Sequence, residues 1–181
     1  MISAIVCVDK NWGIGCQGDL LIKIPEDTKF FKEKTNGHTV IMGRKTYDSL
    51  PVKPLSNREN VIITRKVYKD EYGRYKDEDG VVYTELEQVK NVFKFIQKYP
   101  QDSRNEMFVI GGGTIYKELI PYCDTAYVTK VDYAFENVDT YFPNLEDFPE
   151  WEIESVSEAK EYNGFKYQFY TYKKDDTNEQ N

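Results

Sequence analysis

Short apolar runs recur along the chain and alternate with segments whose apolar residues have helical spacing. The first run, Ile2–Val8, is apolar at nearly every position, which is typical of a strand buried on both faces. In Glu85–Gln97 the apolar residues recur every three or four positions, which predicts an amphipathic helix. Further strands are predicted at Thr39–Met42, Asn60–Thr64, Val81–Tyr83, Met107–Ile110, Ala126–Val131, Trp151–Ser157 and Phe165–Tyr172. Further helices are predicted at Pro25–Thr35, Lys45–Leu50 and Thr114–Ile120.

The order of these elements predicts one α/β domain. Strands alternate with helices through the first two-thirds of the chain, and strands then predominate. This order fits a mostly parallel sheet with helices on both faces and an antiparallel C-terminal edge strand. We expect residues 1–173 to form the domain and residues 174–181 to form a polar tail. A charged stretch at Lys66–Gly80 is expected to be an exposed excursion.

Composition and charge narrow the classes of protein. With 181 residues, 40% of them hydrophobic, the chain is long enough to bury a core of its own. A net charge of −7 argues against nucleic acid or a membrane surface as partner, so an anionic ligand would need a local basic patch. The three cysteines form no disulfide framework, and with a single histidine they form no metal site. No apolar run could span a bilayer. A reduced, soluble, cytoplasmic protein is expected, and a monomer.

Basic residues follow two of the predicted strands, at Gly43–Thr46 and Thr64–Lys66. Free backbone N–H groups at a strand-to-helix turn favour an anion, and the carboxyl ends of parallel strands lie at the same edge of a sheet. A solvated basic turn is the alternative for either segment alone. Together, in an acidic protein, the two segments predict a phosphate-binding site. Gly111–Gly113, which ends a third strand, permits a close backbone approach to a ligand or forms an ordinary tight turn.

One carboxylate, Asp27, stands at the start of a helix whose next turn is aromatic. It is either a favourable charge at a helix N-terminus or, if turned inward, a proton donor whose pKa is raised by burial. Arg58 lies in a loop, where it is either solvated or placed to bind a carboxylate with two hydrogen bonds. A lone acid beside a phosphate-binding turn indicates a cofactor enzyme that needs one proton donor and little else.

In this order, the residues resemble the dihydrofolate reductase family, and the resemblance covers nearly the whole chain. The matching segments are Ile2–Val8, Trp12–Ile24 as a mobile active-site loop, Pro25–Thr35, Val40–Ser49, Pro54–Thr64, Val109–Tyr116, Thr129 and Asp139–Pro143. The resemblance implies an eight-stranded sheet, NADPH as cofactor and reduction of 7,8-dihydrofolate to tetrahydrofolate. It also implies that antifolates bind.

The resemblance assigns roles residue by residue. Asp27 would hold the pterin and promote protonation of N5, with Leu20 and Ile22 from the loop beside it. The implied substrate-binding residues are Ile5, Val6, Asp27, Thr28, Phe31, Leu50, Leu55, Arg58, Ile110 and Thr129, of which Arg58 would bind the glutamate α-carboxylate. The implied cofactor-binding residues are Cys7, Ile14, Gly15, Gly18, Asp19, Gly43, Arg44, Lys45, Thr46, Thr64, Arg65, Lys66, Ile110, Gly111, Gly112, Gly113, Thr114, Ile115 and Tyr116. Gly111–Gly112 matches a cis glycine pair of the family.

The chain departs from the family's pattern at two places. Leu21-Ile22 replaces a common Pro-Trp pair, and Thr28 replaces a commonly apolar helix residue. Ile22 can pack but cannot donate a hydrogen bond, so water placement and inhibitor affinity are affected. Two other functions stay open: an NADPH reductase acting on another pterin or on a pyrimidine intermediate, and a non-catalytic ligand-binding protein with the same fold.

Overall fold

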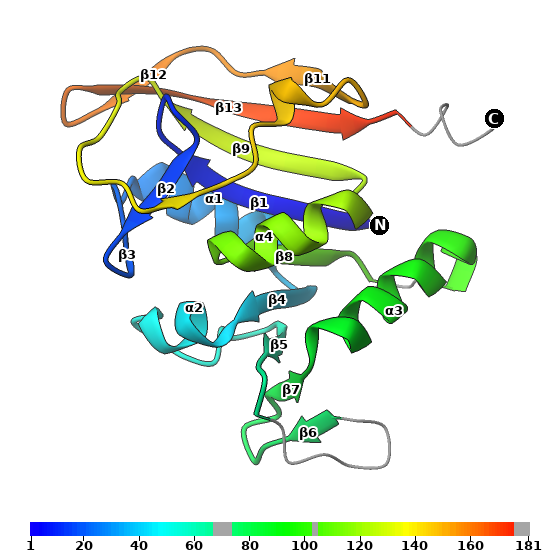
Figure 1. Cartoon of the computed structure of the whole chain (residues 1–181). Coiled ribbons are helices and arrows are strands. Elements are labelled where there is room, and N and C mark those ends of the chain that lie inside the picture. The colour runs from blue at the N-terminus through cyan, green and yellow to red at the C-terminus, as the bar shows by residue number, and fades with distance from the viewer. Residues whose placement is uncertain (67–73, 103–104, 176–181) are drawn as a thin grey trace.

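The computed structural model describes residues 1–66, 74–102 and 105–175, and its centre is a mixed ten-stranded sheet (Figure 1). The strands of this sheet are β1 (Ile2–Val8), β4 (Thr39–Gly43), β5 (Glu59–Ile63), β6 (Arg74–Lys76), β7 (Val82–Thr84), β8 (Met107–Gly111), β9 (Thr125–Val131), β11 (Trp151–Val156), β12 (Lys160–Tyr162) and β13 (Phe165–Lys174). They are ordered β11-β13-β9-β1-β8-β4-β5-β7-β6, and β12 pairs with β13.

The middle of the sheet is parallel, as predicted. The strands from β9 through β1, β8, β4 and β5 to β7 pair in parallel, and β13 pairs antiparallel with β9. The eight strands implied by the resemblance are too few, and β13 is not an edge strand. It is long enough for β12 to pair with its first residues and β11 with its last ones, so it lies inside the sheet.

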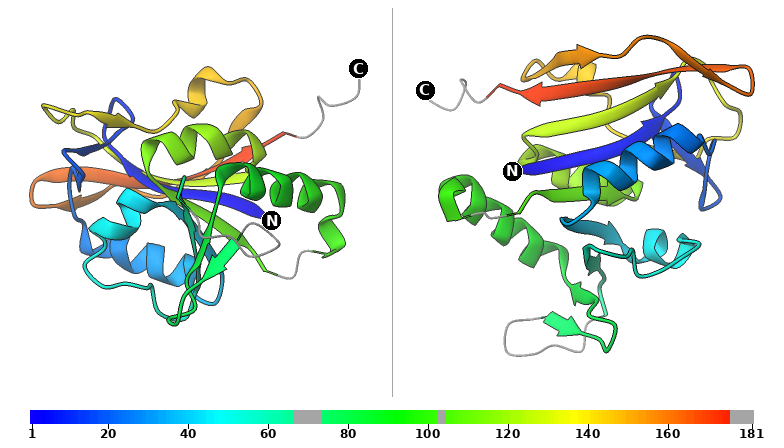
Figure 2. Two further views of the ribbon diagram at one scale, coloured as in Figure 1. Left: turned by 60° about the horizontal axis from the view of Figure 1, so that its bottom comes forward. Right: turned by 180° about the vertical axis from the view of Figure 1, so that it is seen from behind.

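Helices cover both faces of the sheet (Figure 2). The described residues contain the four α-helices α1 (Pro25–Thr35), α2 (Arg44–Ser49), α3 (Leu86–Lys98) and α4 (Gly113–Leu119). Apolar side chains of α3 and α4 pack in a cluster on one face, which includes Phe93 and Leu119. On the other face, Phe30 and Phe31 of α1 pack with buried residues of β1, β4 and β5. The odd and even positions of the apolar strands thus fill two separate layers of the core.

Several predicted boundaries or segments differ in the structure, and three of these differences concern the site or the ends of the domain. The expected loop after β1 contains β2 (Gly13–Cys16) and β3 (Asp19–Leu20), which form a small sheet with β10 (Thr140–Tyr141). These strands are too short to be predicted from an alternation of apolar and polar residues. Part of the expected excursion forms β6, which pairs antiparallel with β7, the strand predicted at Val81–Tyr83; residues 67–73 of the excursion lie outside the described residues. β13 runs to Lys174, one residue past the expected end of the domain, and residues 176–181 of the tail lie outside the described residues.

No helix within residues 1–66, 74–102 and 105–175 has the length and apolar character needed to cross a bilayer.

Candidate active site

Asp27 lies in the first turn of α1, where Pro25 starts the helix. Its Oδ1 accepts a hydrogen bond of 2.6 Å from the hydroxyl of Thr129, which is 1% exposed and lies on β9. The neighbouring Glu26 accepts a 2.6 Å hydrogen bond from the Tyr167 hydroxyl and forms a 2.9 Å ion pair with Lys160. The first turn of α1 is therefore tied to β12 and β13, which turns Asp27 toward the sheet.

The surroundings of Asp27 favour its protonated form. Burial raises its pKa, and the hydrogen bond from Thr129 only partly opposes this rise because it stabilises the carboxylate. The pKa of the Cys7 thiol is raised well above its usual value, mainly by the burial of Cys7 itself and secondly by the charge of Asp27. Burial and then Asp27 also raise the pKa of Tyr116, whose hydroxyl donates a 2.7 Å hydrogen bond to the Ile5 carbonyl. Asp27 can thus hold a proton at a higher pH than an exposed aspartate can.

Apolar residues predicted to bind substrate gather on the α1 face of the sheet. Ile5 is buried there among core residues, and the partly buried side chains packed against this cluster include Phe31, Leu50, Leu55 and Ile110. Val6, the next residue of β1, points to the opposite face, as alternation in a strand requires. Residues from β1, α1, the end of α2, the following loop and β8 therefore form one apolar wall. Asp27 lies on α1, which contributes to this wall.

Arg58 is held in its loop by neighbouring polar groups. Its Nε donates to the Ser56 carbonyl at 2.8 Å and its guanidinium donates to the Thr35 hydroxyl at 3.1 Å. The side-chain amide of Asn60 bonds to the backbone of Leu55 and to the Arg58 carbonyl, which fixes the loop. Burial alone lowers the pKa of Arg58. With no ion pair to a carboxylate in the described residues, this guanidinium retains donors for an external anion.

The glycines after β8 approach the start of α2 closely. Gly111 has φ of +129°, which residues with a side chain rarely adopt, and the Gly111–Gly112 peptide is cis, as the resemblance implied. A Cβ on Gly112 would lie 3.2 Å from the Thr46 Oγ1, and one on Gly43 would lie 3.1 Å from Ile115. The side chains of Thr46 and Ile115 thus pack directly against glycine backbone, and a larger residue at Gly43 or Gly112 would have to displace them.

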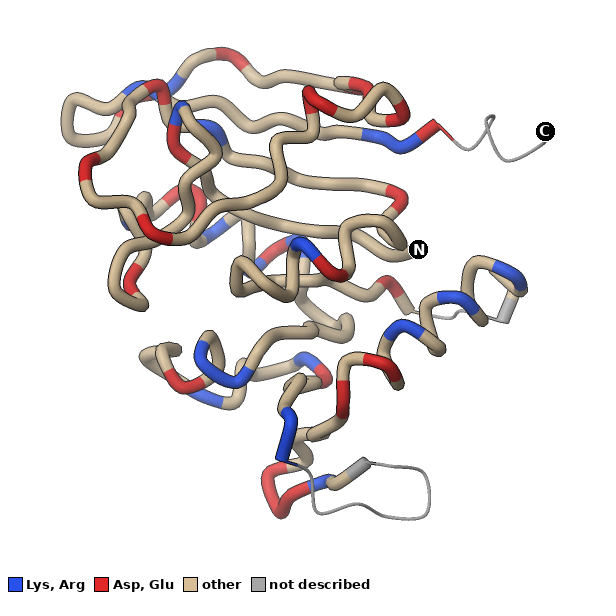
Figure 3. Tube along the Cα trace, viewed as in Figure 1, with Lys and Arg blue, Asp and Glu red and all other residues tan. Residues whose placement is uncertain are grey.

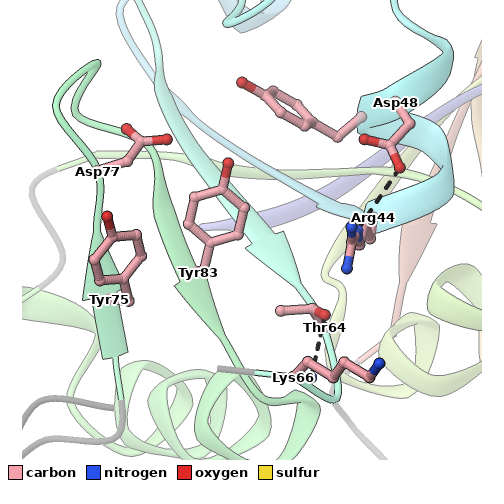
Figure 4. A pocket seen from close by; sticks show the side chains of 8 residues that line it. Arg44, Asp48, Thr64, Lys66, Tyr75, Asp77 and Tyr83 are labelled. Carbon is pink, nitrogen blue, oxygen red and sulfur yellow. Dashed lines mark hydrogen bonds and ion pairs between the residues drawn. The ribbon is translucent and has the colours of Figure 1, made fainter. Parts of the chain in front are cut away.

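A cavity of about 280 Å3 lies between α2 and the β6–β7 hairpin, and two basic residues, two acidic residues, three tyrosines and Thr64 line it. Figure 4 shows Arg44, Thr64 and Lys66 on one side of it, facing Asp77, Tyr75 and Tyr83 from the hairpin. Arg44 also forms a 3.7 Å ion pair with Asp48. Lys and Arg gather at the ends of β4 and β5, with acidic residues in the hairpin turn beside them (Figure 3). The cavity offers cations to an anionic group, and it lies apart from Asp27.

A narrower crevice separates β1 from the segment that follows it. Cys7, Ile14, Leu20 and Ile22 line it, and its volume of about 10 Å3 is too small for a ring. Leu20 is nevertheless 61% exposed. A planar ligand beside Cys7 would require the segment 13–22 to move outward.

Several predicted residues are not brought into these groups. Lys45, Arg65 and Thr114 are exposed and line neither the cavity nor the crevice. Thr28 is exposed, and its hydroxyl donates back to the Ile24 carbonyl at 3.3 Å. Gly15, Gly18 and Asp19 lie in the β2–β3 hairpin and its turn. Their roles stay predictions.

Other residues that shape the site were not predicted. Asp9, which is 2% exposed, accepts hydrogen bonds from the backbone N–H groups of Asn11, Gly13 and Phe135 at 2.8–3.0 Å. An aspartate between a buried strand and a glycine-rich turn was the available signal, since such side chains bond to nearby backbone. The tyrosines of the cavity had no comparable signal: Tyr47 lies on α2, Tyr83 on the predicted strand and Tyr75 in the expected excursion, so nothing local indicated that they meet.

Comparisons with known proteins agree with this geometry. The family model described as dihydrofolate reductase matches residues 1–174. The dihydrofolate reductase of Bacillus subtilis is 35% identical over 176 residues, covering 96% of this chain and 95% of that protein. The Staphylococcus haemolyticus dihydrofolate reductase is 33% identical over 175 residues, with the same coverage.

A solved structure is similar over nearly the full length. Dihydrofolate reductase from Enterococcus faecalis, complexed with NADP(H) and RAB-propyl, is 31% identical, has a TM-score of 0.78 and covers 97% of both chains. The chain belongs to the dihydrofolate reductase family of oxidoreductases.

Proposed function

We propose that this protein reduces 7,8-dihydrofolate to 5,6,7,8-tetrahydrofolate with NADPH and thereby supplies one-carbon metabolism. The observation that carries the proposal is the hydrogen-bonded pair formed by the partly buried Asp27 and the buried Thr129 beside an apolar wall. Within the described residues, Asp27 is the carboxylate that combines a raised pKa with this position, so one residue performs the acid chemistry.

The residues around the glycine turn fit NADPH. Backbone N–H groups near Gly111–Gly113 can approach a bound ligand closely, because glycines carry no side chain that would shield them. Arg44 and Lys66 in the cavity suit the 2′-phosphate that distinguishes NADPH from NADH. When bound, NADPH supplies the hydride that is transferred from nicotinamide C4 to pterin C6.

The chain's own residues bind, orient and protonate the substrate. Asp27 accepts hydrogen bonds from the 2-amino group and N3–H of the pterin, Thr129 supports that edge by donating its hydroxyl to Asp27, and Asp27 promotes protonation of N5. The wall of Ile5, Phe31 and Leu50 packs against the ring system and keeps water away. Segment 13–22 would close over the site, and Ile22 contributes packing without a hydrogen bond.

The test is consumption of NADPH on addition of dihydrofolate, with NADH run in parallel. We expect turnover that prefers NADPH. Tight NADPH binding without turnover of dihydrofolate would instead support the non-catalytic binding protein, and turnover of a different pterin or a pyrimidine would support the related reductase.

Arg58 separates dihydrofolate from substrates that lack a glutamate. Removing its charge as Arg58→Met should raise KM for dihydrofolate about 10- to 100-fold, as expected for a lost charge-assisted hydrogen bond of about 1.5–3 kcal/mol. KM for a pterin without the glutamate should not change. The matched control is Lys29→Met, which removes an exposed cation paired with Glu33 on α1. Equal KM values for dihydrofolate in Arg58→Met and the wild type would contradict the role of Arg58.

Antifolate binding, a monomeric state and a cytoplasmic location belong to the same proposal. Competition of an antifolate with dihydrofolate and a mass measurement in solution test the first two.

A further inference from the structure

A lysine on β9 lies behind Asp27, on the opposite face of the sheet. Successive side chains of a strand point to opposite faces, so Thr129 reaches Asp27 while Lys130 reaches the layer that contains Trp12. The Lys130 side chain is 20% exposed, and its Nζ donates to Glu146 Oε1 at 2.7 Å. The same Nζ lies 4.8 Å from the centroid of the Trp12 ring and 4.9 Å from that of Tyr170.

Glu146 holds this cation in place. Its Oε1 also accepts a 3.0 Å hydrogen bond from the Tyr172 hydroxyl, and the bond from Lys130 is the main reason that the pKa of Glu146 is lowered. Tyr172 in turn packs against the Trp12 ring at a centroid distance of 6.0 Å. We call Trp12, Lys130, Glu146, Tyr170 and Tyr172 the Lys130 cluster.

Trp12 depends on such contacts because its backbone is in an unfavourable conformation. Its φ is +63°, in the left-handed region that bulky residues rarely adopt. Its ring is 6% exposed and stacks on Phe142 at 6.1 Å, and its carbonyl accepts a 2.9 Å hydrogen bond from the Phe142 N–H. Tertiary packing of the ring therefore maintains the local backbone.

The position of Trp12 determines where the next residues lie. Gly13 and Ile14 follow directly, form β2 and line the crevice beside Cys7. Asp9 accepts hydrogen bonds from the backbone of Asn11 and Gly13. The Trp12 side chain, by contrast, is contacted by Lys130 and Tyr172 of the Lys130 cluster. A change at Trp12 would move the segment that contacts the proposed nicotinamide site.

We propose that Lys130 is a positioning residue that acts through Trp12 to hold Gly13 and Ile14, the start of segment 13–22, beside Cys7, while the later residues of the segment move outward to admit the cofactor. The inference rests on the proposed function, because that function makes the crevice a cofactor site. An ammonium ion above an indole ring is attracted by the negative ring face, and partial removal from water strengthens the attraction. The strand that supports Asp27 through Thr129 thus also supports the segment on the other side of the site.

The first test compares Lys130→Met, which keeps the length without the charge, with Lys130→Arg, which keeps a cation over the ring. Stopped-flow release of NADPH should be about 5-fold or more faster in Lys130→Met, with a matching rise in KM for NADPH, as the loss of a partly buried cation–π contact predicts. Lys130→Arg should stay close to the wild type. The matched control is Lys10→Met, because Lys10 forms a 3.6 Å ion pair with Asp132 in which both side chains are mostly exposed. Release from Lys130→Met within 2-fold of the wild-type rate, or equally fast release from Lys130→Arg, would overturn the proposal.

A second readout needs neither cofactor nor turnover. Since the chain has two tryptophans, Trp151→Phe isolates the emission of Trp12. Acrylamide should quench Trp12 more strongly when Lys130→Met is added to this background, and not when Lys130→Arg is added. Unchanged quenching would overturn the proposal that Lys130 positions Trp12. If quenching rises in a protein that does not reduce dihydrofolate, the positioning of Trp12 by Lys130 is supported and the proposed function is contradicted.

Discussion

The acid region and the phosphate cavity use electrostatics in opposite ways. Asp27 is largely shielded from water by the groups around it and accepts one hydrogen bond of 2.6 Å, and desolvation is the main cause of its raised pKa. Arg44 lies on the cavity and pairs with Asp48 while both side chains remain about 60% exposed, at 61% and 59%. Burial changes the pKa of a single group, whereas exposed cations attract an anion with a strength that water and salt weaken. The first arrangement suits proton transfer and the second suits recognition of a charged cofactor.

The largest expected effect is at the acid. Asp27→Asn keeps the shape and can still accept from Thr129, but it supplies no proton. The turnover number near neutral pH should fall about 10²- to 10⁴-fold, the usual contribution of general acid catalysis. The dissociation constant for NADPH should stay within about 2-fold. The substitution removes the charge at Asp27 and leaves Arg44 and Lys66 of the phosphate cavity unchanged. Full activity would exclude Asp27 as the proton donor.

The cavity should give a binding effect without a chemical one. Arg44→Met should raise KM for NADPH about 10- to 100-fold through the loss of a charge-assisted hydrogen bond, leave kcat unchanged and leave KM for NADH unchanged. The wild-type KM for NADPH should also rise with salt. Arg65→Met is the matched comparison, because Arg65 is exposed and does not line the cavity. An equal or greater effect at Arg65 would place the phosphate outside the cavity.

The pH dependence of stability gives a smaller effect with a definite sign. The pKa of Asp27 is raised in the folded state, so the folded protein binds this proton more tightly than the unfolded chain does. Stability from this group is present below the ordinary aspartate pKa and is lost as pH rises through the raised value. Asp27→Asn does not titrate, so its Tm relative to the wild type should increase as pH rises through that window. A Tm difference that is constant with pH would show that burial does not perturb Asp27.

The smallest expected effect is at Cys7. Because the thiolate is the reactive form, the raised pKa should make alkylation of Cys7 by iodoacetamide slow, as followed by peptide mass spectrometry. Asp27→Asn should speed this reaction only slightly, since burial is the larger cause of the shift and the Asp27 charge the smaller one. A large acceleration would reverse that order.

Local patterns predicted much of the fold and part of the site. Continuous apolar runs predicted β1, β4, β5 and β8, because a strand covered on both faces has little room for polar residues. The pairing of β11 with β13 could not be predicted. The hairpins β12–β13 and β6–β7 did carry turn signals, Asn163-Gly164 and Asp79-Gly80, but the pattern of apolar residues does not show them. The pairing of a short strand depends on a partner that can lie far away in the sequence, and it is made through backbone groups that every residue has. Neither leaves a pattern in the side chains of the strand itself.

The sequence by itself determined the class of the fold, the helix that carries Asp27 and the basic ends of two strands. These depend on local periodicity, on Pro25 and on charge, which act within a few residues. Only the tertiary structure decided that Thr129, 102 residues away, bonds to Asp27, that Tyr83 faces Arg44 across a cavity, and that Lys130 covers Trp12. The raised pKa of Asp27 belongs to this second group, because desolvation comes from all the elements packed around a side chain and not from its neighbours in the chain.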